Sequence, residues 1–130
     1  MSLWEKHRIE DKVLSILEQV PESAEGHHLG RPFLTAYQIA IEFAQRYPKV
    51  VDELGWPVGG IGAGQRNTLA QYLARRLSQY VKDHPEGPIE GGFLSNRYLE
   101  DISFKEDELA FSSSLTDSGF TLSMFRLREQ

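Results

Sequence analysis

The chain has 130 residues, a formal net charge of −5, 40% hydrophobic and 25% charged residues, and no cysteine. This length corresponds to a single domain over residues 1–130 that can bury a core without disulfides or metal ions. The lack of cysteine excludes a disulfide framework, a thiolate metal site and a cysteine nucleophile. No apolar run approaches the roughly 20 residues of a membrane span, and no signal-peptide pattern opens the chain, so we expect a cytoplasmic protein.

Charge is distributed unevenly along the chain. Residues 1–53 carry six basic and nine acidic groups, and residues 83–130 carry four basic and ten acidic groups. The 29 residues 54–82 carry four basic groups and no Asp or Glu. The negative total disfavours a nucleic-acid surface spread over the whole molecule. The acid-free stretch indicates either a surface that meets an anion or an interface with an acidic part of the same protein.

The first helix is predicted over residues 3–20, where apolar residues recur at a spacing of three and four. Pro21 ends this helix, and residues 21–32 have the composition of a loop. The residues on the apolar face are Ile9, Val13, Ile16, Leu17 and Val20.

A capping box of Thr35 and Gln38 predicts the start of the next helix, which runs to about Tyr47. Pro48 suits the first turn of a shorter helix, and Gly55 suits its C-terminal stop. Five of the eleven glycines then fall in residues 55–64, which we interpret as a loop.

The clearest helix is predicted from about Asn67 to Lys82, and residues 83–88 end it. Its apolar face carries Leu69, Ala70, Leu73, Leu77, Tyr80 and Val81. Its opposite face carries Gln71, Arg75, Ser78, Gln79 and Lys82.

The last third of the chain alternates apolar and polar residues, which is typical of half-buried strands. Strands are predicted over residues 102–104, 109–111 and 120–127, with a polar turn over residues 105–108 between the first two. We expect a helical turn at residues 98–101.

The order of elements predicts an α+β fold, in which three to four helices are followed by a small antiparallel sheet of about three strands. The helical part spans residues 3–84 and the small β part spans residues 98–128.

The glycine-rich loop 59–64 precedes a predicted helix, where backbone N–H groups bind anions and glycine lets a phosphate approach. A P-loop is not complete, because Gln65 and Arg66 stand where Lys and Ser or Thr are required, and the dinucleotide motif fails as well. The loop is either a structural turn or a phosphate contact, with nucleotide binding as the weaker alternative. The candidate anion-binding residues are Gly60, Gly62 and Gly64.

The polar face of the helix 67–82 has the residue types that read DNA. Arg and Gln form bidentate contacts with guanine and adenine, and no carboxylate on this face repels phosphates. An ordinary solvated face is the alternative. Arg66 and the loop N–H groups would hold phosphate, and Arg76 would contact the DNA backbone or a partner. The candidate nucleic-acid-binding residues are Arg66, Gln71, Arg75, Arg76, Ser78 and Lys82.

Helices followed by a small antiparallel sheet resemble the architecture of winged-helix domains, and the run 34–40 (LTAYQIA) looks like the capped second helix of many helix-turn-helix proteins. This resemblance implies that 67–82 is the recognition helix and that the hairpin 102–111 is the wing. Two departures are clear. The connection 47–67 is far longer than a turn of about 3–4 residues, and the wing tip 105–108 is acidic.

Catalysis finds little support in the sequence. The chain has four histidines, and the adjacent pair His27–His28 lacks the spacing of a helical zinc site. Residues Ser112–Ser114 lack a nucleophile-elbow pattern. We predict a non-enzymatic protein with no catalytic residue, no metal site and no cofactor.

The sequence therefore predicts a small winged-helix-like module that binds double-stranded DNA, as a transcriptional regulator or an accessory factor. We expect a homodimer, because a single helix gives too little contact for specific affinity. The alternatives are a protein–protein interaction module of the same fold and an anion- or nucleotide-binding protein that uses the loop 59–64.

Overall fold

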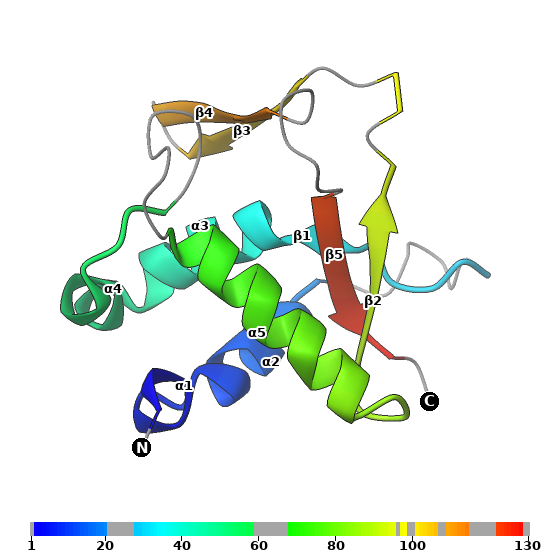
Figure 1. Cartoon of the computed structure of the whole chain (residues 1–130), viewed down its shortest axis with the longest axis horizontal. Coiled ribbons are helices and arrows are strands. Elements are labelled where there is room, and N and C mark those ends of the chain that lie inside the picture. The colour runs from blue at the N-terminus through cyan, green and yellow to red at the C-terminus, as the bar shows by residue number, and fades with distance from the viewer. Residues whose placement is uncertain are drawn as a thin grey trace.

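The computed structural model describes residues 2–20, 28–58, 68–95, 97–98, 101–106, 109–114 and 122–128. The helices are α1 (Leu3–Lys6), α2 (Ile9–Glu18), α3 (Ala36–Arg46), α4 (Pro48–Leu54) and α5 (Leu69–Asp83). The strands are β1 (Leu34–Thr35), β2 (Ile89–Leu94), β3 (Asp101–Glu106), β4 (Leu109–Ser114) and β5 (Leu122–Leu127). The helices precede all strands except β1, and the predicted α+β class is confirmed (Figure 1).

The strands form two sheets. β5 lies between β1 and β2 in an antiparallel three-stranded sheet, whereas β3 and β4 form a separate hairpin. The prediction that the hairpin and the last strand share one sheet was therefore wrong, and two of the strands, β1 and β2, lie outside the β part predicted over 98–128. The turn predicted at 98–101 was also wrong at its end, because Asp101 already belongs to β3.

β2 was not predicted because Gly91 and Gly92 interrupt its pattern of side chains. Gly91 faces Phe125 across the sheet, and a Cβ atom on Gly91 would lie 3.1 Å from the Phe125 ring. A larger residue at this position would have to displace the ring. The glycine that interrupts the strand pattern in the sequence therefore leaves room for the Phe125 ring to pack against the backbone of β2.

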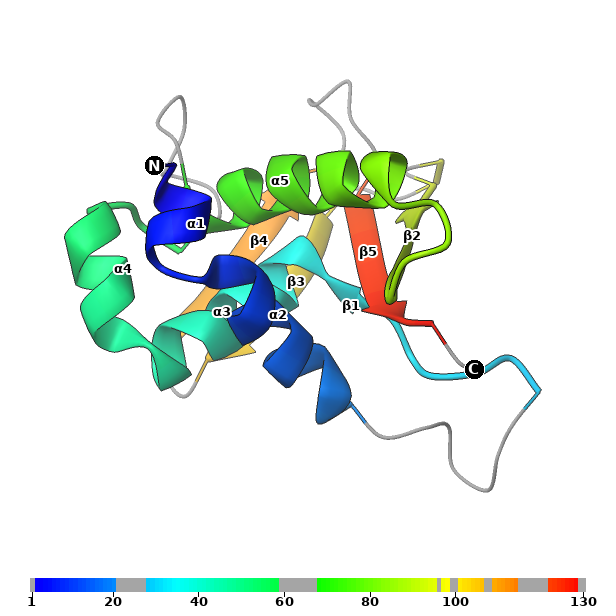
Figure 2. The ribbon, with the colours of Figure 1, turned by 90° about the horizontal axis from the view of Figure 1, so that it is seen from below.

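The main core joins the helices to one face of the three-stranded sheet. α5 contributes the predicted stripe of Leu69, Leu73 and Leu77, which packs in one cluster with Ile89 of β2 and Phe125 of β5. α5 lies along one side of the molecule, with α2, α3 and the sheet beneath it (Figure 2). No helix among the described residues combines the length and the apolar character that a membrane crossing requires.

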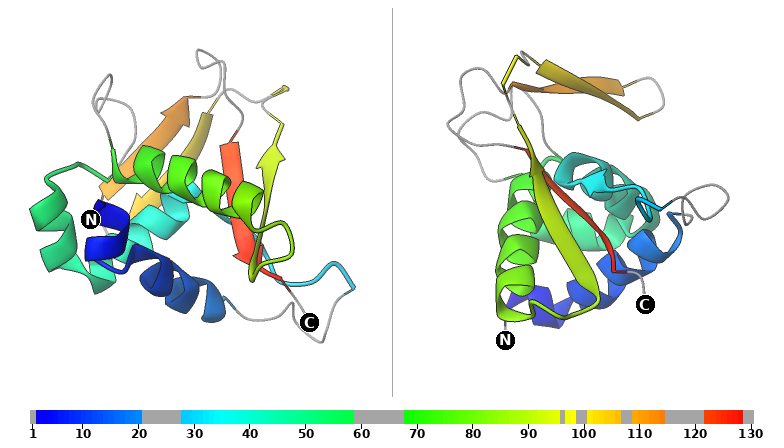
Figure 3. Two further views of the ribbon diagram at one scale, coloured as in Figure 1. Left: turned by 60° about the horizontal axis from the view of Figure 1, so that its bottom comes forward. Right: turned by 90° about the vertical axis from the view of Figure 1, so that its right-hand side faces the viewer.

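The β3–β4 hairpin covers α3. The Phe104 ring stacks on the Tyr37 ring with centroids 4.9 Å apart, and Ile41 and Leu122 complete this second cluster. The hairpin therefore lies over α3, on a different side of the molecule from the outward surface of α5 (Figure 3).

The first predicted helix is interrupted after one turn, so its prediction as a single helix over 3–20 was wrong. Arg8 adopts a left-handed conformation with φ 51° between α1 and α2. The Lys12 Nζ atom donates a hydrogen bond to the His7 carbonyl at 2.6 Å, and His7 Nε2 lies 3.4 Å from a carboxylate oxygen of Glu53 on α4. No glycine or proline marks this break in the sequence.

The predicted boundaries of α3 and α4 are confirmed. The Thr35 hydroxyl accepts the Gln38 backbone N–H at 3.2 Å, and the Gln38 side chain accepts the Thr35 N–H at 2.8 Å. Pro48 is the first residue of α4, and Gly55 ends it with a left-handed φ of 72°. Short-range signals of this kind depend only on neighbouring residues, which is why the sequence contains them in full.

We expect Phe43→Ala to lower the free energy of unfolding by about 3–5 kcal/mol, because it leaves a cavity where a fully buried ring fills the core. Chemical denaturation measures this loss. The matched control is Leu29→Ala, which removes a side chain that is 68% exposed and should change stability by less than about 0.5 kcal/mol. Similar losses in both variants would contradict the core described here.

Candidate nucleic-acid interface

The start of α5 is fixed by contacts within the protein. Thr68 is 3% exposed, and its hydroxyl accepts the Gln71 N–H at 3.0 Å. The N–H groups of Leu69 and Ala70 donate to the carbonyls of Pro57 and Val58 at 2.8 and 2.9 Å. The first N–H groups of a helix are those that otherwise bind an anion. In α5 these groups already have partners, so the helix terminus itself offers little to a phosphate.

One side of α5 is exposed along its length. Gln71, Arg75, Ser78 and Lys82 follow one another at helical spacing, and all four are exposed. We call these four residues the α5 outer face. No described helix or strand covers this side of α5 (Figures 2 and 3). Within the part of the chain that the structure describes, Arg75 and Lys82 have no ion pair and no hydrogen bond from their side chains.

Arg76 differs from the α5 outer face. It is half-buried, and its guanidinium lies 5.1 Å from the centre of the Trp4 ring. Trp4 is itself 8% exposed and contacts the Tyr72 ring at a centroid distance of 6.4 Å. Arg76 thus has an aromatic partner within the molecule and helps to hold α1 against α5. The prediction that it contacts DNA or a partner did not include this internal role.

Tyr72 lies between the core and the α5 outer face. Trp56 packs on it with centroids 4.9 Å apart. Burial raises the pKa of Tyr72 above its ordinary value, and the positive charges of Arg76 and Arg75 offset part of that rise. The two cations are therefore close enough for their charge to act on the edge of this aromatic group.

The C-terminal end of α5 carries both a cation, Lys82, and an anion, Asp83. The helix extends one residue beyond the predicted end, to Asp83. Gln79 Nε2 donates to the Asp83 carboxylate at 2.9 Å, which holds a negative charge at the end of the helix. The cationic part of the α5 outer face therefore centres on Arg75.

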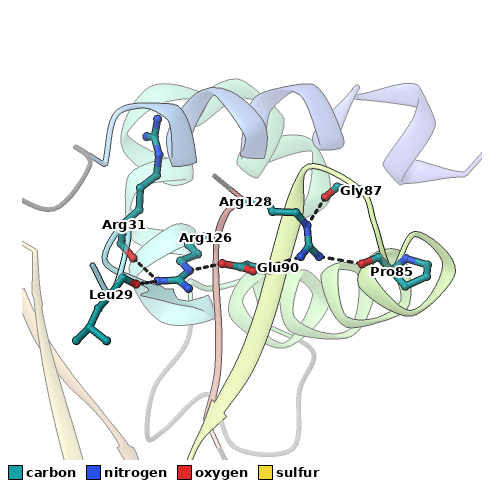
Figure 4. Close-up of polar contacts among 7 residues, drawn as sticks. All are labelled: Leu29, Arg31, Pro85, Gly87, Glu90, Arg126 and Arg128. Atoms are coloured by element: carbon teal, nitrogen blue, oxygen red, sulfur yellow. Dashed lines mark hydrogen bonds and ion pairs between the residues drawn. The ribbon is translucent and has the colours of Figure 1, made fainter. Parts of the chain in front are cut away.

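Two arginines on the other side of the sheet are occupied in the structure (Figure 4). The Glu90 carboxylate pairs with Arg126 at 2.5 Å and with Arg128 at 3.4 Å. Further hydrogen bonds from these two guanidinium groups reach the carbonyls of Leu29, Arg31, Pro85 and Gly87. We call this group the Glu90 clamp. Its arginines serve the fold, in contrast to the exposed Arg75 and Lys82.

Several predicted site residues lie outside the described residues. These are Gly60, Gly62, Gly64 and Arg66. The structure brings together the remaining predicted residues of α5, with Arg76 set apart toward Trp4.

Two exposed aromatic residues were missed in the sequence. Phe93 of β2 is 66% exposed and Tyr98 is 91% exposed, with the Arg97 guanidinium 5.1 Å from the Tyr98 ring centre. Recognising that residues 89–94 form a strand would have placed Phe93 beyond the end of the core, but the glycines concealed that strand.

No protein-family model matches the chain, and no curated protein and no solved structure is significantly similar to it. A function for this protein is therefore inferred from the geometry and chemistry of its own surfaces.

We expect the stability of the protein to fall as the pH rises above about 10. The raised pKa of Tyr72 means that the folded state holds this proton more tightly than the unfolded state, whose value is 10.0. The resulting stabilisation is present below the unfolded pKa and is lost as the pH rises through the folded pKa. Denaturant titrations at increasing alkaline pH measure the effect. Tyr72→Phe should reduce this dependence, and an unchanged dependence in that variant would contradict the assignment to Tyr72.

Proposed function

We propose that this protein binds double-stranded DNA through the α5 outer face, as a transcriptional regulator or an accessory factor with an architecture that resembles winged-helix domains. The observation that carries the proposal is the exposure of Gln71, Arg75, Ser78 and Lys82 on one side of α5, with no described carboxylate paired to either cation. An α-helix fits the major groove of DNA, and a helix that is buried on one side can present the other to base edges.

The side chains on this face match the chemistry of base recognition. Arg75 is suited to a bidentate contact with guanine, and Gln71 is suited to one with adenine. Ser78 can contact either a base or a phosphate, and Lys82 can contact a phosphate. Asp83 at the end of α5 would repel the DNA backbone. This charge supports an approach in which the first turns of the helix enter the groove most deeply, as the recognition helix does in helix-turn-helix proteins.

The proposal assigns no DNA contact to the β3–β4 hairpin. The hairpin packs on α3 through Phe104 and Tyr37, and it lies on another side of the molecule from the α5 outer face (Figure 3). The helix alone therefore supplies the base contacts, and a second copy of it is needed for a site of useful specificity.

We expect Arg75→Ala combined with Lys82→Ala to weaken binding to a mixed-sequence duplex by at least tenfold at low salt. Each cation that contacts a phosphate releases counterions, so its loss should reduce the slope of log K against log salt by about 1. Fluorescence anisotropy at several salt concentrations measures both quantities.

The control is Lys6→Ala combined with Lys49→Ala, which removes the same charge from exposed positions on α1 and α4. This control should keep most of the affinity and the slope. If both double variants bind alike, the attraction is a general charge effect and α5 is not the interface.

A protein–protein interaction module is the second candidate. The exposed Phe93 and Tyr98 side chains favour it, because aromatic residues are enriched in protein–protein interfaces. Absence of DNA binding at low salt, together with stable association with another protein, would favour this candidate over the first.

A further inference from the structure

The outer edge of β2 offers unpaired backbone groups. β5 pairs with β2 on one side, and no described residue pairs with its other side. The Arg128 N–H donates to the Pro88 carbonyl at 2.8 Å, in line with the register that places Ile89 opposite Leu127. Residues in an antiparallel pair alternate between facing the partner strand and facing away from it. Ile89, Gly91 and Phe93 therefore direct their N–H and C=O groups outward.

This edge lacks the features that protect other edge strands. Natural sheets block such edges with charged side chains, especially lysine, with proline or with a bulge. The strand 89–94 contains neither lysine nor proline, and its pairing with β5 is continuous over all six residues. Its one charged residue, Glu90, is paired with Arg126 and Arg128 within the protein. β2 is the element nearest the viewer when the molecule is seen from its right-hand side (Figure 3, right). The edge is therefore open to another strand.

We propose that two copies of this chain pair through the outer edges of β2, antiparallel, around a two-fold axis at Gly92. In this register Phe93 of each copy lies opposite Gly91 of the other. The outward N–H and C=O groups of these two residues then form hydrogen bonds across the axis. The pairing closes with one two-fold axis, as most homodimers do.

The shape of the strand favours a second copy over an unrelated strand. Phe93 is a large, exposed ring, and Gly91 is an exposed position without a side chain. The two residues lie on the same face of β2, two positions apart, so the two-fold pairing places each Phe93 ring beside Gly91 of the other copy, where it can meet the Phe125 ring that packs against that glycine. A strand from an unrelated protein would need an aromatic residue opposite Gly91 and a glycine opposite Phe93.

The pairing also orients the two copies of α5. The apolar stripe of α5 packs on the face of the sheet that carries Ile89 and Phe125. A two-fold axis perpendicular to the sheet keeps both copies of α5 on one side of the joined six-stranded sheet. Both α5 outer faces can then approach one ligand, and this single consequence rests on the proposed function.

The first test is a disulfide at the proposed axis. The chain has no cysteine, and a Cβ atom on Gly92 would have Met124 Cε at 4.0 Å as its nearest neighbour, so Gly92→Cys fits the fold. Directly opposite residues that are not hydrogen-bonded to each other lie about 4.5 Å apart at Cα, a distance that permits a disulfide. Mild oxidation should convert most of the variant to a covalent dimer on a non-reducing gel.

The control is Ser78→Cys, which places an exposed thiol on the α5 outer face. It should form much less dimer at the same concentration and oxidant. Equal rates for the two variants would overturn the proposal. A dimer in which Gly92→Cys does not cross-link would overturn it too, because the axis would then lie elsewhere.

The second test is the mass of the protein in solution without DNA. Sedimentation should give about twice the chain mass of 14.8 kDa for the wild type and for Leu29→Lys, and the single chain mass for Phe93→Lys. Leu29 is as exposed as Phe93, so both variants replace an exposed apolar side chain with lysine and differ only in its position. A wild-type monomer, or a dimeric Phe93→Lys, would overturn the proposal. Since DNA is absent from both tests, a failure here is distinct from a failure of the α5 interface.

Discussion

The burial of one side of α5 is the constraint on which the rest of the molecule depends. Leu69, Leu73 and Leu77 are fully buried against Ile89, Phe125 and the helices α2 and α3. Removing these apolar side chains from water contributes about 1.5–3 kcal/mol each. The same contact fixes which side of α5 faces outward. The position of Arg75 at the surface is therefore a direct consequence of where the leucines pack.

Charged groups in this protein divide into those that hold the fold and those that face solvent. Arg126 and Arg128 share Glu90, and Arg46 contacts Glu42, Ser15 and Gln19. Arg76 lies over Trp4. Arg75 and Lys82 have no such internal partner among the described residues. The acid-free stretch of the sequence thus contains both a cation that packs within the protein and cations that remain available to a ligand.

Much of the helical part was predictable because its signals are local. The capping box at Thr35, the stop at Gly55 and the apolar stripe of α5 each depend on residues within a few positions of one another. The break at Arg8 was not predictable, because it depends on packing of the segment against α4 through His7 and Glu53. The pairing of the strands was not predictable either, because it joins residues that are far apart in the sequence.

The residues of the candidate interface could be predicted from the sequence, but the contacts that surround them could not. Helical periodicity places Gln71, Arg75, Ser78 and Lys82 on one side without any tertiary information. The periodicity could not reveal that Arg76 turns toward an aromatic ring on α1, or that carbonyls of residues 57–58 occupy the first N–H groups of α5. The strand β2 was not predicted because Gly91 and Gly92 interrupt the alternation of apolar and polar side chains by which strands are recognised.

The Glu90 clamp has a consequence for the way α5 is held. Arg128 joins the last described residues of the chain to the carbonyls of Pro85 and Gly87, in the turn that leaves α5. Arg126, in β5, donates hydrogen bonds to the carbonyls of Leu29 and Arg31, in the segment that leads into β1. These hydrogen bonds tie the turn at the C-terminal end of α5 to the three-stranded sheet. In the proposed dimer, the distance between the two copies of α5 would therefore depend on the joined sheet.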